Sequence, residues 1–374
     1  MKIAILTITD GQNYGNRLQN YAMQKLLEPF GNEVETIQRR TSRDVVGVQK
    51  IIIDAKYLIK RVIHYPTNHY GRIRRNKFKK FNQEYINFSR FVLQNNVAPE
   101  EICQSYDCFV VGSDQVWNTH FDIVREDLYN HLAMFAPEQK KIAFAASFGT
   151  NKIEPGYEEI FSSALNDFRS IGVREKSGVQ IVSELCQGKE AQVVLDPTMM
   201  ISVDQWRLIE RKPNYVKGKY IVSYFLGGRG EKITKYIQKI ASSYNADVVN
   251  LETEFLQDIQ IENPAMFVSS PDEFVWLMDH AECILTDSFH ATVFAILFHR
   301  PFCTFERVAA EKGNDMGSRI KTLLEMFHLT QYYGNLEHPD TSPGLYDTNN
   351  VEKILNDNRK ISLNFLSSAL HEER

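Results

Sequence analysis

The chain has 374 residues, of which 43% are hydrophobic and 24% charged, and its formal net charge is -4. This length exceeds one simple core, so we expect two domains of a globular protein. The net negative charge gives no general reason to expect a nucleic-acid partner. The five cysteines have neither metal-ligand spacing nor an even disulfide framework, which favours a reducing, cytoplasmic location and no metal site.

The first forty residues follow the strand, helix, strand order of a doubly wound α/β domain. Residues 2–7 predict a buried parallel strand rather than a signal peptide, residues 17–30 a helix and residues 33–38 a second strand. The loop between the first strand and the helix supplies three candidate ligand contacts, namely Asn13, Gly15 and Asn16. A glycine lets the backbone approach a ligand, and amide side chains can bond it. An ordinary loop is the alternative, and the missing GxGxxG pattern argues against a dinucleotide.

Residues 39–80 form a strongly basic segment, with thirteen basic and two acidic side chains. Within it, residues 48–63 have apolar side chains at helical spacing. A basic amphipathic helix can lie on an anionic membrane or bind a polyanion. The alternative is a solvated face on an insertion, residues 39–86, that packs over the first domain.

Four further apolar runs, at 109–111, 141–146, 171–173 and 193–195, each end in small or polar residues. Ligands of open α/β sheets bind at the carboxyl ends of the strands, so we expect these ends to line one crevice. The candidate residues at these ends are Gly112, Ser113, Asp114, Ser147, Phe148, Gly149 and Arg174.

A second α/β unit follows a linker at residues 213–218. Strands are predicted at 220–225, 248–249 and 283–286, and helices at 232–244, 271–279 and 291–299. We therefore predict an N-terminal domain at 1–212, a C-terminal domain at 213–345 and a C-terminal helical segment at 346–374 that packs back on the first domain.

The turn after the strand at 283–286 is the strongest candidate site of the second unit. Asp287 and Ser288 are good N-cap residues, and His290 falls in the first turn of the following helix. Free amides and the helix dipole favour an anion there. A structural histidine is the alternative. Arg319 opens a later helix and could hold a phosphate or carboxylate with its guanidinium fork, or be a surface charge.

Six short motifs occur in order along the chain: NYGNRLQNYA at 13–22, VVGSDQVWN at 110–118, ASFG at 146–149, VRE at 173–175, LDPT at 195–198 and DSFHA at 287–291. Together they resemble the polysaccharide pyruvyl transferase family, from the first strand to about residue 319. The resemblance implies an α/β fold of two Rossmann-like doubly wound domains that face a cleft, as in glycosyltransferases of the B type. It also implies transfer of a pyruvyl group from phosphoenolpyruvate to two hydroxyls of a sugar, which gives a pyruvate ketal and phosphate.

The resemblance assigns roles to individual residues. His290 matches the histidine of the family's Arg-Leu-His or Ser-Phe-His motif, and a histidine can act as general acid or base. Ser288 stands where many members have an arginine, which leaves the donor's phosphate and carboxylate to Arg174 and Arg319. Asp114 is expected to act as a base for the acceptor hydroxyl or to bind the sugar.

The expected partners follow from the same resemblance. We expect phosphoenolpyruvate as donor substrate, no cofactor, and a saccharide acceptor that belongs to a cell-surface polysaccharide or its lipid-diphosphate-linked precursor. A cytoplasmic protein with peripheral contact at the inner face of the membrane fits these partners. Two other readings stay open: a glycosyltransferase that uses a nucleotide-sugar, and a non-catalytic glycan-binding relative.

Overall fold

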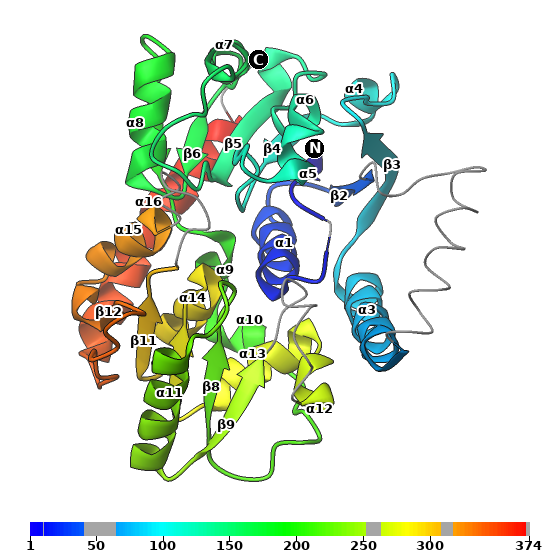
Figure 1. The fold of residues 1–374 in the computed structure, drawn as a ribbon. Helices are drawn as coiled ribbons and strands as arrows, with labels where there is room; N and C mark the ends of the chain where they lie inside the picture. The colour runs from blue at the N-terminus through cyan, green and yellow to red at the C-terminus, as the bar shows by residue number, and fades with distance from the viewer. Residues whose placement is uncertain (10, 41–64, 252–262, 308–316, 372–374) are drawn as a thin grey trace.

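Two parallel β-sheets organise the molecule, one in the upper and one in the lower half of Figure 1. The computed structural model describes residues 1–9, 11–40, 65–251, 263–307 and 317–371. One sheet has seven strands in the order β3-β2-β1-β4-β5-β6-β7, and the other has five in the order β12-β11-β10-β8-β9. The α/β class that we expected is confirmed by these two parallel sheets.

The seven-stranded sheet is built from the first half of the chain. Its strands are β1 (Lys2–Leu6), β2 (Glu33–Arg40), β3 (Phe88–Gln94), β4 (Cys108–Val111), β5 (Lys141–Ala146), β6 (Ile171–Val173) and β7 (Ala191–Val193). The accompanying helices are α1 (Tyr14–Leu27), α3 (Tyr65–Tyr85), α4 (Ile102–Ser105), α5 (Asp122–Arg125), α6 (Leu128–His131), α7 (Glu158–Asn166) and α8 (Lys176–Leu185). Strands β4 and β5 are buried at every position, which fits a parallel sheet covered on both faces.

Two element boundaries in this half differ from the prediction. Helix α1 begins three residues earlier than expected because the Asn13 side chain caps it by accepting the amide of Asn16. Strand β7 ends at Val193, before the predicted Leu195, whose amide instead donates to Ser362 Oγ at 2.9 Å.

The five-stranded sheet contains β8 (Tyr220–Tyr224), β9 (Asp247–Leu251), β10 (Cys283–Thr286), β11 (Phe302–Phe305) and β12 (Tyr333–Gly334). Its helices are α11 (Glu231–Tyr244), α12 (Pro264–Phe267), α13 (Pro271–His280), α14 (Phe289–Leu297) and α15 (Ser318–Met326). Short helices α9 (Pro197–Met200) and α10 (Val203–Arg207) connect the two halves. Helix α14 begins two residues before the predicted start at 291, so His290 lies inside its first turn.

An apolar interface joins the two halves. The ring of Tyr14 stacks on that of Phe274 at 4.6 Å, and the rings of Trp206 and Phe294 meet edge to face at 4.9 Å. Arg74 of α3 donates to the Tyr14 hydroxyl at 2.9 Å and to the Phe267 carbonyl. These contacts hold the start of α1 against the second half of the chain.

The long helix α16 (Thr348–His371), red in Figure 1, spans both halves. Val351 and Leu355 belong to the hydrophobic cluster that includes the second sheet, whereas Leu366 and Leu370 pack in a cluster with Ile3 of β1. The C-terminal helix therefore reaches back to the first strand of the chain.

The basic segment is only partly described, since residues 41–64, including the predicted helix at 48–63, lie outside the described residues. Arg39 is buried and pairs with Asp127, Arg74 is buried at the interface between the halves, and Lys77 bonds Glu273. These three basic side chains have internal partners, so the described part is not one continuous solvated face. The exposed basic side chains of α3 are Arg72, Arg75, Lys79 and Lys80. Across the described residues, no helix combines the length and the apolar character needed to cross a bilayer.

Candidate active site

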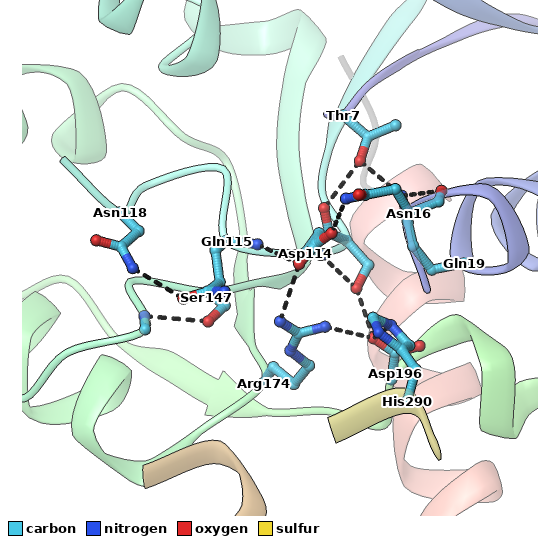
Figure 2. A network of polar contacts seen from close by, with 12 residues as sticks. Thr7, Asn16, Gln19, Asp114, Gln115, Asn118, Ser147, Arg174, Asp196 and His290 are labelled. Atoms are coloured by element: carbon cyan, nitrogen blue, oxygen red, sulfur yellow. Dashed lines mark hydrogen bonds and ion pairs between the residues drawn. The ribbon is translucent and has the colours of Figure 1, made fainter. Parts of the chain in front are cut away.

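His290 lies where the two halves of the molecule meet. It sits in the first turn of α14, directly after β10, and the side chain of Ser288 caps that helix. The imidazole Nε2 lies 3.7 Å from Asp196 Oδ2, an ion-pair distance, and 9% of the His290 side chain is exposed. Figure 2 shows His290 and Asp196 facing the strand ends of the first sheet.

Asp196 is the centre of the polar network. Its carboxylate accepts hydrogen bonds from Ser113 Oγ at 2.7 Å, Arg174 Nη1 at 2.8 Å and Thr198 Oγ1 at 2.6 Å. Burial alone would raise the pKa of Asp196, but the contact with His290 and the charge of Arg174 outweigh it and lower the pKa. Asp196 is therefore an anion that can stabilise a protonated imidazole.

Asp114 forms a second anionic position beside the first. The Asn16 side-chain amide donates to Asp114 Oδ2, and Arg174 Nη2 lies 3.4 Å from Asp114 Oδ1. Thr7 and Gln19 support this arrangement, because Gln19 Nε2 donates to Thr7 Oγ1, which donates to the Ser113 carbonyl (Figure 2). Strands β1 and β4 thus bring their ends to one polar cluster, as the strand-end argument predicts.

Two arginines flank the ring of Phe289. The guanidinium of Arg174 lies 4.5 Å from the ring centroid and that of Arg319 5.9 Å from it. Burial alone would lower the pKa of Arg174, but Asp196 and Asp114 raise it. Burial and the charge of Arg174 lower the pKa of Arg319 to about 9. The two predicted anion-binding arginines therefore converge, in different electrostatic environments.

Gly15 makes room for the His290 imidazole. A Cβ at this position would lie 2.1 Å from His290 Nδ1, so any larger residue would displace the imidazole. The prediction that Gly15 lets the backbone approach a substrate stays a prediction, since this contact shows only that Gly15 leaves space for the imidazole. The contact also means that the first helix of the chain fixes the position of a histidine some 275 residues later.

A family model matches the part of the chain that contains these residues. The model of the family described as polysaccharide pyruvyl transferase matches residues 13–307, which contain Asp114, Arg174, Asp196 and His290. The chain belongs to the polysaccharide pyruvyl transferase family. No curated protein matches the chain in sequence.

Solved structures show the fold of this family member. A putative UDP-N-acetylglucosamine 2-epimerase from Listeria monocytogenes aligns with a TM-score of 0.50 at 10% identity, over 100% of this chain and 98% of that one. The UDP-GlcNAc 2-epimerase from Methanocaldococcus jannaschii aligns with a TM-score of 0.47 at 13% identity, over 96% and 99% of the two chains. The Neisseria meningitidis enzyme gives 0.44 at 12% identity, with 96% and 99% covered. The expected glycosyltransferase-B-like fold is confirmed by the first of these likenesses together with the two parallel sheets.

Three of the predicted contact residues have structural roles at the ends of the strands. Phe148 is completely buried and packs on Trp117 at 5.0 Å, so it belongs to the core of the first half and not to a substrate surface. Gly112 and Gly149 have positive φ values, and a Cβ at either would strike Phe144 or Gln115. These three positions shape the strand ends.

Polar candidates also have local partners. Ser147 Oγ donates to Glu175 Oε1 at 2.9 Å, and Asn13 caps α1. Ser288, where many family members have an arginine, caps α14 through the amide of Ala291 at 3.5 Å. Asp287 does not cap α14 as predicted, because its carboxylate accepts the amides of Leu226 and Gly227 at 2.6 and 2.8 Å. Asp287 therefore fixes the loop that follows β8.

Two acidic residues of the site were missed as candidates although they stand in the quoted motifs. Asp196 precedes a proline and reads as an ordinary N-cap, and Glu175 reads as a helix-start charge. Glu175 Oε1 accepts the amides of Phe148 and Gly149 as well as the Ser147 hydroxyl. Burial raises the pKa of Glu175, although Arg174 and Arg319 act against it. The roles of these two carboxylates become visible only in the structure, where the VRE and LDPT motifs come into contact through Arg174 and Asp196.

We expected no metal site, and one group in the described ranges has suitable spacing for a metal. Glu210, Asp279 and His280 bring ligand atoms within 4.8 Å of one another. Asp279 already pairs with Arg207 at 2.7 Å and Arg300 at 3.4 Å, so two cations neutralise its charge. The residues present therefore do not suit a divalent metal.

Proposed function

We propose that this chain transfers a pyruvyl group from phosphoenolpyruvate to two hydroxyls of a saccharide and releases phosphate. The observation that carries the proposal is the meeting of His290 with the Asp196 carboxylate beside two buried arginines, in a member of the pyruvyl transferase family. An acid–base group next to cationic groups is the combination that this donor requires, because the donor carries a phosphate and a carboxylate.

The reaction proceeds in two additions to the same carbon. A proton is added to the methylene carbon of the donor while the first sugar hydroxyl attacks C2, and the proton of that hydroxyl is lost to a base. The C2–O bond to phosphate then breaks with its electron pair, and the second hydroxyl attacks C2. The proton of the second hydroxyl ends on the departing phosphate, so the products are a pyruvate ketal and inorganic phosphate.

His290 and Asp196 suit the proton transfers. The His290 imidazole lies 3.7 Å from the Asp196 carboxylate, and a histidine can deliver a proton to the donor and accept one from a hydroxyl. Asp114 is the candidate to bind or deprotonate the acceptor, because its carboxylate lies in the same network on the first-sheet side. Arg174 and Arg319 supply positive charge for the donor's anionic groups and for charge that develops as phosphate leaves.

The acceptor is proposed to be a sugar of a cell-surface polysaccharide or of its lipid-linked precursor. For a lipid-linked acceptor, the exposed basic residues of α3 would hold the protein at an anionic membrane surface, at about 1 kcal/mol per residue close to it. Flotation with anionic and neutral vesicles tests this part. Salt-sensitive recovery with anionic vesicles only is expected, and equal recovery with both kinds would contradict it. Replacing Arg72, Arg75, Lys79 and Lys80 by glutamine should remove the difference.

Phosphate release from phosphoenolpyruvate is the deciding experiment. The protein is incubated with the donor and a panel of free and lipid-linked saccharides, and the product is examined by mass spectrometry for the added ketal. Saccharide-dependent phosphate release with a matching ketal is expected. Release of a nucleotide from a nucleotide-sugar would instead indicate a glycosyltransferase, and glycan binding without any turnover would indicate a non-catalytic relative.

A further inference from the structure

Arg74 of α3 joins the start of α1 to the second half of the molecule. Its Nη1 donates to the Tyr14 hydroxyl at 2.9 Å and to the Phe267 carbonyl. Its Nη2 donates to the Gln12 carbonyl at 3.2 Å. The Tyr14 hydroxyl in turn donates to the Ser269 carbonyl at 3.1 Å. Helix α3 therefore lies beside both α1 and α12, as Figure 1 shows.

The surroundings of Arg74 fix this side chain in place. It is 1% exposed, and its guanidinium lies 4.7 Å from the centre of the Tyr14 ring and 5.2 Å from that of the Phe267 ring. Aromatic faces attract a guanidinium, but its hydrogen-bond partners among the described residues are one hydroxyl and two carbonyls, all uncharged. A buried charge without a carboxylate partner costs free energy. Stability alone therefore does not explain an arginine at this position.

The residue that follows Tyr14 is the one that contacts the catalytic candidate. A Cβ on Gly15 would lie 2.1 Å from His290 Nδ1, so the imidazole lies against the backbone of α1. The Tyr14 ring also stacks on Phe274, whose ring meets that of Phe294 in α14 edge to face at 6.0 Å. A shift of the start of α1 would therefore move the surface against which the His290 ring lies.

We infer that Arg74 is a positioning residue for His290: it fixes the start of α1, and the start of α1 fixes the imidazole. The expected effect on turnover rests on the proposed function, whereas the effect on the imidazole does not. Arg74 belongs to the basic segment at residues 39–80, so one cation of that segment acts inside the molecule, next to the site.

The test uses two variants of this contact and one matched control. Arg74→Met removes the guanidinium and keeps a long unbranched side chain. Tyr14→Phe removes the hydroxyl that Arg74 bonds and keeps the ring that stacks on Phe274. Lys77→Met is the control, because Lys77 is a cation of the same helix that bonds Glu273 of the second half at 2.8 Å and not α1. A purely structural role of α3 predicts similar effects of the two methionine variants.

Two quantities are measured that a loss of stability alone would not change: the ring signals of His290 and the separate values of kcat and donor KM. NMR of protein with labelled histidine records the ring signals, and His290→Ala identifies the signal of His290 among the ten histidines. Arg74→Met and Tyr14→Phe should shift this signal. Both should lower kcat about 10- to 100-fold, with donor KM changed less than about twofold, because the reacting groups are displaced. Lys77→Met should leave the signal, kcat and KM as in the unaltered protein.

An unshifted His290 signal in both Arg74→Met and Tyr14→Phe would overturn the inference, and so would an equal shift in Lys77→Met. If thermal unfolding shows that Arg74→Met does not fold, Tyr14→Phe decides alone, because it removes only a hydroxyl. A shifted signal in these variants of a protein that does not turn over phosphoenolpyruvate would keep the inference and overturn the proposed function. Turnover of phosphoenolpyruvate with an unshifted signal in both variants would do the reverse.

Discussion

The two sides of the site are built differently. The first-sheet side consists of Ser113, Asp114, Arg174 and Asp196, and these side chains bond mainly to one another. The second-sheet side consists of Ser288, Phe289, His290, Ser318 and Arg319 at the starts of α14 and α15. There, His290 Nε2 and Ser318 Oγ have no hydrogen-bond partner among the described residues.

This difference separates Asp196, which has several internal partners, from His290, which has fewer. A cluster whose donors and acceptors already satisfy one another is rigid and holds its shape without a ligand. Groups without partners are ready to bind or to exchange a proton. We therefore expect a substitution of Asp196 to change geometry and stability, and a substitution of His290 to change turnover with the fold intact.

The largest effect is expected from His290→Ala. It should lower turnover roughly 100- to 10,000-fold, the range that a lost proton transfer typically costs, with little change in melting temperature. Phosphate release and thermal unfolding measure the two quantities. His290→Gln keeps a hydrogen bond but cannot transfer a proton, so substantial activity in that variant would reduce His290 to a binding role.

Asp196→Asn tests the first-sheet side. It breaks a buried ion pair with Arg174 and should cost about 3 kcal/mol of unfolding free energy at neutral pH. The sign of the pH dependence follows from the lowered pKa of Asp196. Its stabilisation is fully present above the unfolded pKa, near 3.9, and is lost as the pH falls through the folded value.

Urea unfolding of both proteins at a series of pH values measures this linkage. The stability difference between the unaltered protein and Asp196→Asn should shrink below about pH 4. A difference that stays constant across the series would mean that Asp196 is not held as an anion.

Gly15→Ala tests whether activity depends on the position of the His290 ring against the start of α1. The added Cβ would lie 2.1 Å from His290 Nδ1 and must displace the ring. A displacement near 1 Å can lower turnover up to about 100-fold. We expect a fall in kcat with a smaller change in donor KM. Gly218→Ala is the matched control, since a Cβ there meets nothing within 4 Å, and it should leave both parameters unchanged.

Ser288→Ala should have the smallest effect. The cap of α14 is long, at 3.5 Å, so its loss should cost about 0.5 kcal/mol, the low end for N-caps. Thermal unfolding measures it, with turnover as a second readout. A large loss of turnover without loss of stability would show that Ser288 contacts the substrate in the place of the arginine that many family members have there.

The sequence predicted the bounds of a helix or strand well where the local residue pattern determines them. Strands β5, β6 and β10 have the predicted ends, because a buried parallel strand is a short apolar run closed by polar residues. The helix start at Tyr14 was placed three residues late, because its cap is Asn13. The helix start at Phe289 was placed two residues late, although Ser288, which forms its cap, was among the predicted N-cap residues.

The sequence predicted several residues of the site, but not which of them contact one another. His290, Asp114 and Arg174 follow from strand ends and motifs, and they do lie in one network. Phe148 looked like a site residue because it stands beside Ser147, yet successive residues can point into the core and away from it. The sequence could not show Asp196 as the centre of the network. Its partners Arg174, Ser113 and His290 are 22, 83 and 94 residues away along the chain. Its remaining contact, with the amide of Thr198, is that of an ordinary helix N-cap.

The reach of α16 has a consequence for how the protein is made. Leu366 and Leu370 complete the hydrophobic cluster that contains Ile3, and Ser362 holds the amide of Leu195. On a ribosome that adds roughly 5 to 20 residues per second, the first sheet waits on the order of ten seconds for the helix that finishes its core. During that interval its apolar edge is exposed to solvent and to chaperones. Nascent chains stalled before residue 348 should therefore be digested by protease within the first sheet, whereas the released full-length chain should resist.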